Sequence, residues 1–493
     1  RAPAVTGHPL RDMLMIGLPS VATMGSHTVM QFVDKLMVSR IGPEPVYVSA
    51  QSNGAMLSWM MLAFMIGMSG VVNSFVSQNL GAGTPRRGAA YAWNGLWIAL
   101  VYWAVLVIPV IAVAPALFGH LHTDEALVGL ETGYARVMLA GSLFVVWTRA
   151  IHHYFYGMHR PWVVLVSAVA GNSANIVCNY ALIFGRLGAP EMGLEGAAYG
   201  TVIGALIEFS IPMALFLSPR YARAFGTRRA WRVSVACLRG IVRVGLAPGL
   251  MFLNEMACWA ALTIWLVPLA GRAAGDDPVL HNTMGWIVLQ YMHLSFMPAV
   301  GLSIAAQAMV GKAMGMGRPD IATARTVLAL KITVGYMGLC ALAFVLFPGA
   351  LVSVFIDAAT PAADRARLIE IGTAIMLAAA VFQVFDALAI TTTAALRGAG
   401  DTVWPGVATI VLSWTCIVGV GRGLIEVAPG LGSLGPWIGA ALFIIALGIA
   451  LGARFLGGKW KTMSLVDGGA GPDPGLDLDP YDDVVPDPTM VAE

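Results

Sequence analysis

The feature that most constrains this chain is a series of long apolar segments that recurs from one end to the other. They lie at about 12–40, 46–80, 88–118, 126–158, 161–185, 193–219, 236–271, 280–314, 320–347, 363–397, 402–425 and 435–457. Each is long enough to cross a bilayer, because a helix rises about 1.5 Å per residue and the hydrocarbon core is about 30 Å thick. With 58% hydrophobic and 11% charged residues, the 493-residue chain is too apolar for a soluble protein of its size. The pattern predicts an all-α polytopic membrane protein with twelve transmembrane helices.

Basic residues are concentrated in alternate loops between these segments. Those that would share one side are Arg86, Arg87, His159, Arg160, Arg220, Arg223, Arg228, Arg229, Arg232, Lys312, Arg318, Arg397, Arg454, Lys459 and Lys461. Cytoplasmic loops carry an excess of Lys and Arg, and an even number of spans brings both ends of the chain to one side. We therefore expect a multi-pass protein of the cytoplasmic (inner) membrane, with both termini cytoplasmic.

Short motifs recur between the two halves of the chain. GAGTP at 81–85 recurs as GMGRP at 315–319, and IGLP at 16–19 recurs as VGLAP at 244–248. Six spans in each half give the two copies the same orientation, as in parallel repeats related by an axis along the membrane normal. The sequence therefore predicts two six-helix lobes related by a pseudo-twofold axis, with a central cavity between them.

The repeat and the charge pattern together divide the chain. We predict an amino-terminal lobe at 1–219, a basic cytoplasmic connector at 220–235, a carboxyl-terminal lobe at 236–458 and an acidic disordered tail at 459–493. The connector is expected to lie against anionic headgroups of membrane lipids. The tail is rich in Asp, Pro and Gly and has little to bury.

Two acids inside predicted spans of the carboxyl-terminal half are the first candidates for function. Glu255 is the one ionisable residue of the apolar stretch 248–268, and Asp386 lies in the span at 363–397. A charge at the bilayer centre costs on the order of 2.5–3.5 kcal/mol, so an acid retained there indicates a site. If both face one cavity, the pair can hold a proton or Na⁺ and release it when another cation or water enters. The alternative is structural, with each acid bonded to a neighbouring helix or an arginine.

Polar and aromatic residues accompany these acids. Asn254 precedes Glu255, and Phe382 lies one turn before Asp386, where its ring could face an organic cation.

A second set of candidates lies in the amino-terminal half. Asp34 shares a helical stripe with Gln31 and His27, and Asn175 and Asn179 are one turn apart in the fifth span. Amide and carboxylate oxygens suit a hard cation such as Na⁺. The alternative is amide hydrogen bonding between helices, which joins membrane bundles.

The sequence does not support several other classes of protein. We find no nucleotide-binding motif, nucleophile–base pair or metal-ligand cluster in a plausible context, so we predict neither an enzyme, a cofactor nor ATP as the energy source. Nothing indicates nucleic acid as a partner. A channel would more often be a symmetric oligomer than a two-lobed single chain, and we expect a monomer.

These landmarks, in this order, resemble the multidrug and toxic compound extrusion (MATE) family, and its NorM-like branch in particular. The matching pieces are GLPSVATMGSHTVMQFVDKLMVSRIG at 17–42, FVSQNLGAG at 75–83, NIVCNYALIFG at 175–185, MGLEGAAYGT at 192–201 and ALRGAGDT at 395–402. The resemblance implies a V-shaped molecule that exports amphipathic, mainly cationic drugs by antiport against H⁺ or Na⁺. It also implies that Glu255 and Asp386 are the acids that mark the NorM-like branch in its seventh and tenth helices.

The same resemblance implies an amino-lobe cation site made of Asp34, Asn175, Asn179 and Thr201. Family members frequently have Asp where this chain has Asn179, so one charge is missing and Na⁺ would be held less tightly. Some relatives have Tyr where this chain has Phe382, which removes a hydroxyl ligand. Bound Na⁺ is therefore possible at Asp34 or Glu255, beside proton coupling. A rival within the superfamily is a flippase for lipid-linked saccharides, which favours a cationic cavity.

Overall fold

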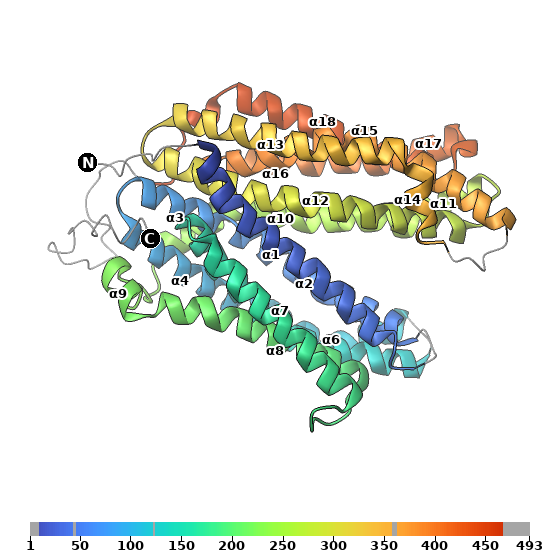
Figure 1. Cartoon of the computed structure of the whole chain (residues 1–493), viewed down its shortest axis with the longest axis horizontal. Coiled ribbons are helices and arrows are strands. Elements are labelled where there is room, and N and C mark those ends of the chain that lie inside the picture. Colours follow the sequence, from blue (N-terminus) through green and yellow to red (C-terminus); the bar gives the residue numbers. More distant parts are fainter. Residues whose placement is uncertain (1–8, 43–45, 122–123, 357–361, 467–493) are drawn as a thin grey trace.

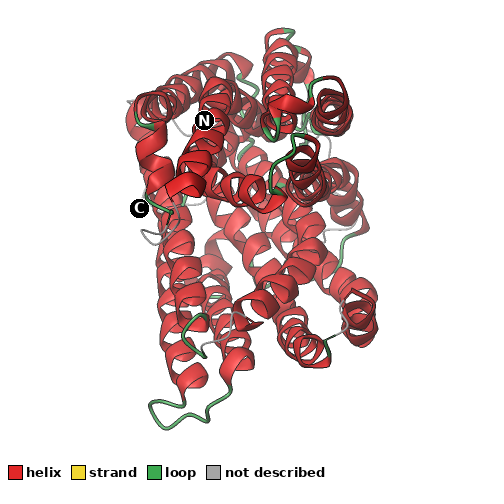
Figure 2. Cartoon of the chain, turned by 90° about the vertical axis from the view of Figure 1, so that its right-hand side faces the viewer, coloured by secondary structure: helices red, strands yellow, loops and turns green. Residues whose placement is uncertain are grey.

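The computed structural model describes residues 9–42, 46–121, 124–356 and 362–466, and the described residues form helices and loops without a strand (Figure 2). Eleven helical stretches among them are long and apolar enough to cross a membrane. The remaining long helix, α1 (Pro9–Val38), is less apolar and carries four charged residues, Arg11, Asp12, Asp34 and Lys35. Its 30 residues suffice to span a membrane, and it packs against both α7 and α12. The prediction of twelve spans is confirmed once α1 is counted.

The first six spans form the amino lobe. After α1, its elements are α2 (Val46–Ser69), α3 (Val71–Gly81), α4 (Pro85–Tyr102), the π-helix η1 (Trp103–Val107), α5 (Ile108–Leu121), α6 (Glu125–Gly157), α7 (Pro161–Phe184) and α8 (Gly193–Phe216). Proline begins α4 and α7, where the missing N–H needs no partner, and Gly185 ends α7 in the left-handed conformation with φ +61°. The short helix α9 (Pro219–Phe225) follows in the basic connector and buries Tyr221 and Phe225.

The last six spans form the carboxyl lobe. Its elements are α10 (Val235–Ala260), the π-helix η2 (Ala261–Leu266), α11 (Val267–Ala273), α12 (Pro278–Gly315), α13 (Pro319–Leu346), α14 (Pro348–Ser353), α15 (Ala362–Ala399), α16 (Val403–Leu412), the π-helix η3 (Ser413–Val420), α17 (Gly421–Val427), η4 (Pro429–Leu431), α18 (Leu434–Leu456) and η5 (Lys459–Thr462). The π-helices η2 and η3 contact each other. Such segments are frequent at functional sites because they widen a helix locally.

The two lobes meet at one end of the molecule and diverge toward the other, which gives the V shape (Figure 1). The closed end is the one where α1 begins and α18 ends, and we call it the terminal end. The lobes join through α1 against α12, α2 against α10, and α3 against α12 and α15.

The sequence repeat explains this junction. A Cβ atom on Gly17 of α1 would lie 3.0 Å from Leu302 Cδ2 of α12, and one on Gly245 of α10 would lie 2.9 Å from Met68 Cγ of α2. Gly17 and Gly245 are the glycines of the recurring IGLP and VGLAP motifs, so each lobe packs the same glycine against the other lobe. The predicted pseudo-twofold relation of the lobes is confirmed.

Hydrogen bonds close the terminal end. Gln307 Nε2 of α12 donates to the Gly70 carbonyl at 2.8 Å, and Gln78 Nε2 of α3 donates to the Gly398 carbonyl at 2.9 Å. Nearer the start of α1, Arg325 Nη2 lies 3.1 Å from Asp12 Oδ2. These bonds use buried polar groups that would otherwise lack partners, so they hold the lobes together in this state.

The chain after α18 packs against the terminal end as well. In η5, Trp460 is 1% exposed and stacks on Phe455, and the backbone N–H of Leu465 donates to Gln78 Oε1 at 2.8 Å. Residues 459–466 of the predicted disordered tail are therefore folded onto the bundle. The rest of that predicted tail, 467–493, lies outside the described residues.

Candidate cation-binding sites

Glu255 and Asp386 both lie in the carboxyl lobe, near enough to interact electrostatically although α10 and α15 make few direct contacts. Glu255 lies on α10 shortly before η2, Asp386 lies in the middle of α15, and both are half-buried. Their charges interact with each other. Neither carboxyl has a hydrogen bond or ion pair with another group in the described parts of the chain. Two interacting acids without donors form a site that gains free energy when a cation or a proton enters it.

A basic residue, Arg397, stands near this acid pair at the end of α15. Its charge interacts with that of Glu255, its guanidinium packs against Gly70 of the amino lobe, and its buried Nε has no hydrogen-bond partner among the described residues. Sequence reasoning placed Arg397 in a loop and missed this contact. The ALRGAGDT motif that contains it was the available signal.

Asn254 and Phe382 do not join the acid pair. Asn254 Nδ2 donates to Ser413 Oγ at 2.9 Å, and its Oδ1 accepts from Trp414 Nε1 at 2.8 Å, so Asn254 links α10 to η3. Phe382 is 1% exposed within the hydrophobic core of the carboxyl lobe. Its ring therefore packs among apolar side chains and offers no face to a ligand in this state.

The four residues expected in the amino lobe do come together. Asn179 Nδ2 donates to Asp34 Oδ1 at 2.6 Å and to Asn175 Oδ1 at 3.3 Å. Asn175 Nδ2 donates to Thr201 Oγ1 at 3.1 Å, and the Thr201 hydroxyl donates to the Ala197 carbonyl at 2.9 Å. Asp34, Asn175 and Asn179 are buried. One connected chain of polar groups thus joins α1, α7 and α8.

Two buried amide oxygens in this part of the amino lobe have no hydrogen-bond partner among the residues that the structure describes. Asn179 Oδ1 is buried without a hydrogen-bond partner in the described residues, and so is Gln51 Oε1. Gln51 of α2 forms a side-chain hydrogen bond with Tyr134 of α6, and Tyr134 interacts electrostatically with Asp34. Amide oxygens are ligands that a hard cation takes, but in this state Asn179 Oδ1 packs against Gly200 of α8 and Asn179 presents its Nδ2 to Asp34. Sequence reasoning missed Gln51, because its neighbour Tyr134 comes from a distant helix.

A groove of about 350 Å³ lies beside this chain of polar groups, between the carboxyl-terminal ends of α1 and α7. Apolar and aromatic side chains line it, among them Leu36, Tyr180 and Phe184, together with Arg40 and Arg186. Two guanidinium groups make it a poor site for an organic cation, because like charges repel.

Glu208 has partners that sequence reasoning did not find. It is buried on α8, and its carboxylate lies near His27 of α1 and His152 of α6. No group of three or more His, Cys, Asp or Glu side chains in the described parts of the chain is arranged to hold a metal ion.

Two lobes of membrane helices with acids inside the spans are typical of membrane transporters. Residues 19–181 and 285–419 match the family model described as MatE, and the chain belongs to this family. It is 28% identical over 465 residues to the probable multidrug resistance protein NorM of Mesorhizobium japonicum, covering 92% of this chain and 93% of that protein. The protein of the same description from Pseudomonas putida is also 28% identical, with 93% and 96% covered.

Solved structures agree with the fold. A crystal structure of MATE in complex with MaL6 superposes with a TM-score of 0.81 at 20% identity, covering 92% of this chain and 98% of that one. An outward-facing multidrug resistance MATE family transporter gives a TM-score of 0.78 at 22% identity, with 92% and 95% covered. Its family and its NorM-named relatives make the protein a multi-pass membrane transporter of the multidrug-resistance type, and not an enzyme.

Proposed function

We propose that this protein is a secondary active antiporter that exports amphipathic, mainly cationic small molecules in exchange for H⁺ or Na⁺. The observation that supports this most is the pair Glu255 and Asp386, whose charges interact while neither carboxyl has a hydrogen-bond donor among the described residues. A cationic substrate and a coupling cation both relieve the repulsion between such acids. They therefore compete for the pair, which is the requirement for exchange.

The chain from Asp34 to Thr201 is proposed as a second or alternative cation site. It has a single carboxylate, that of Asp34, because position 179 is Asn. A second acid at position 179 would raise the affinity of the site for Na⁺. This favours H⁺ over Na⁺ as the coupling ion in the amino lobe.

We further propose that the protein works as a monomer in the cytoplasmic membrane with both termini in the cytoplasm. The terminal end, where the lobes are joined, then faces the cytoplasm, and the diverging ends face outward (Figure 1). In that orientation the structure corresponds to the state that releases substrate and admits the coupling ion.

A lipid-linked saccharide flippase is the less favoured alternative. Arg397 is the basic group nearest the acid pair, and its charge is opposed by Glu255. A phosphate would have to compete with that carboxylate for it, which lowers the affinity for an anionic headgroup.

Transport in proteoliposomes tests the proposal. Purified protein would be reconstituted with a fluorescent cationic dye, and dye movement would be recorded under an imposed pH gradient and, separately, an imposed Na⁺ gradient. We expect one of the two gradients to drive the dye against the concentration difference of the dye. Collapsing that gradient with an ionophore should stop the dye movement. Dye movement that is equal with and without both gradients, and equal to protein-free vesicles, would refute antiport.

A further inference from the structure

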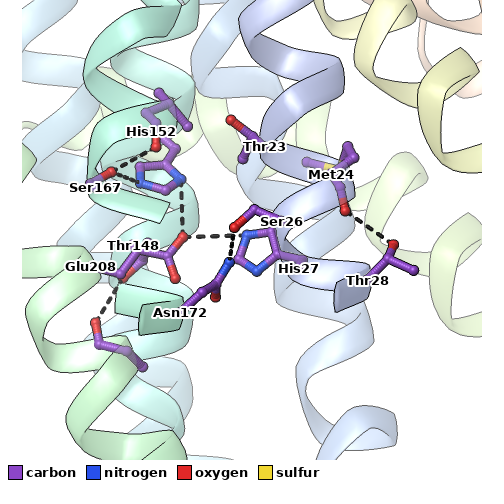
Figure 3. A network of polar contacts seen from close by, with 12 residues as sticks. Thr23, Met24, Ser26, His27, Thr28, Thr148, His152, Ser167, Asn172 and Glu208 are labelled. Atoms are coloured by element: carbon purple, nitrogen blue, oxygen red, sulfur yellow. Dashed lines mark hydrogen bonds and ion pairs between the residues drawn. The ribbon is translucent and has the colours of Figure 1, made fainter. Parts of the chain in front are cut away.

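A cluster of three titratable side chains, the buried Glu208 and His152 and the partly buried His27, joins α1, α6 and α8 in the amino lobe (Figure 3). Glu208 Oε1 lies 3.4 Å from His27 Nε2 and 3.9 Å from His152 Nδ1. His152 is 2% exposed and Glu208 is 8% exposed. Two imidazoles on one buried carboxylate oxygen can exchange a proton with it, because each ring changes its charge near neutral pH in water.

The hydrogen bonds of Ser167 determine which ring nitrogen of His152 carries hydrogen. The Ser167 hydroxyl donates its single hydrogen to the Val164 carbonyl at 2.9 Å, so it can only accept from His152 Nε2, which lies 3.0 Å away. With Ser167 bonded in this way, Nε2 of His152 is assigned the hydrogen. Nδ1, the nitrogen that faces Glu208, carries one only when the ring is cationic.

A neutral His152 thus directs a lone pair at the Glu208 carboxylate. Placing a proton on Nδ1 replaces this repulsion with attraction, and a small side-chain rotation would shorten 3.9 Å to hydrogen-bond distance. The unprotonated arrangement is therefore strained electrostatically, and the protonated one is satisfied.

Other charged groups set the balance of the cluster. On α6, Arg149 interacts electrostatically with Glu208 and His152, His153 lies beside Arg149, and the Tyr156 hydroxyl is buried within reach of Glu208. Arg397 of α15 interacts electrostatically with His153. The positive charge of Arg149 stabilises the Glu208 carboxylate and opposes a charge on His152, so the Glu208 carboxylate is the group that favours the proton.

We propose that His27, Glu208 and His152 form a proton-binding site of the amino lobe, separate from the Asp34 chain, in which the proton resides on His152 Nδ1 against the Glu208 carboxylate. His27 lies two turns before Asp34 on α1, and next to it Ser26 accepts a hydrogen bond from Asn172 of α7 at 2.7 Å. The site therefore adjoins the seam between α1 and α7 that also holds Asp34. Its place in transport rests on the proposed antiport, whereas proton binding itself does not.

Proton uptake by the purified full chain in detergent tests this site without any transport. The wild type and Glu208→Gln would be titrated between pH 5 and 8 with an indicator dye. We expect the variant to take up about one proton fewer over this range, because the amide leaves His152 Nδ1 without an anionic partner. Glu191→Gln makes the same substitution at an exposed carboxylate between α7 and α8 and is the matched control.

A second measurement identifies the atom. In ¹⁵N-histidine spectra of the wild type, one buried ring should keep a protonated Nε2 throughout while its Nδ1 gains a proton as the pH falls, and this signal should be absent in His152→Gln. Superimposable titration curves for the wild type and Glu208→Gln, or spectra in which no ring shows this change, would overturn the proposal. Because neither readout depends on a gradient, either result is independent of whether antiport is confirmed.

Discussion

Replacing Asn179 by Asp should convert the amino-lobe chain into a much tighter Na⁺ site. Asn179 Nδ2 lies 2.6 Å from Asp34 Oδ1, so Asn179→Asp puts a second carboxylate against the first in a buried setting. Even if side-chain rotation separates the charges to about 4 Å, their repulsion is about 4 kcal/mol at an effective dielectric constant of about 20. Each ~1.4 kcal/mol is a tenfold change in an equilibrium constant. The affinity for a cation that removes this repulsion should therefore rise by up to about a thousandfold.

The assay is equilibrium binding of radioactive Na⁺ to purified protein at pH 8, where competition from protons is weak. We expect Asn179→Asp to reach half-saturation at a Na⁺ concentration at least about 100-fold below that of the wild type, allowing for partial relaxation. The matched control is the exchange Asp34→Asn with Asn179→Asp, which restores one carboxylate and one amide and should bind like the wild type. Equal Na⁺ affinity for the wild type and a folded Asn179→Asp variant would refute this account of the site.

Three further predictions concern topology, the end of the chain and acid stability. A cysteine at the exposed Arg229 (Arg229→Cys) should react with a membrane-impermeant maleimide only after cells are permeabilised, and labelling of intact cells would contradict cytoplasmic termini. Deleting 467–493 should leave dye export unchanged. Extending the deletion to 457–493 should lower the melting temperature, because the buried Trp460 is lost. Equal melting temperatures for the two deletions would argue against this role of Trp460. Asp276, between α11 and α12, accepts hydrogen bonds from Arg367 and His281, which hold the pKa of its carboxyl below the usual range. The resulting stabilisation is present above the unfolded-state pKa and is lost as the pH falls through the lower folded-state pKa, so Asp276→Asn should lower the melting temperature at pH 7 and have little effect at strongly acidic pH.

The helices and the lobe repeat could be predicted from the sequence because their signals are local. Proline and glycine mark the ends of the spans, and the recurring IGLP and VGLAP motifs indicated that the two lobes are repeats. Asn175 and Asn179 could be placed on one face of α7 because four residues make about one helical turn. The pairing of Asp34 with Asn179 came from the family resemblance.

Contacts between distant helices could not be predicted in the same way. Glu208 shows no partner on its own helix, and its histidines come from α1 and α6, which only the packing of the bundle brings near. Asn254 precedes Glu255 in the sequence but turns to Ser413 and Trp414 of η3, because adjacent residues point about 100° apart on a helix. Beyond Ala260, η2 alters the helical period, so residues past it do not continue the face of α10 that carries Glu255.

The central claim is that Glu255 and Asp386 act as one coupling site, and the export activity of Glu255→Gln, Asp386→Asn and the double variant tests it most directly. Dye export driven by the effective ion gradient would be measured in proteoliposomes containing equal amounts of folded protein. We predict that each single variant abolishes export and that the double variant is no worse than either, because residues that act as a unit are non-additive. Near-normal export by the single variants, with losses that add in the double variant, would contradict the claim and transfer the coupling role to Asp34.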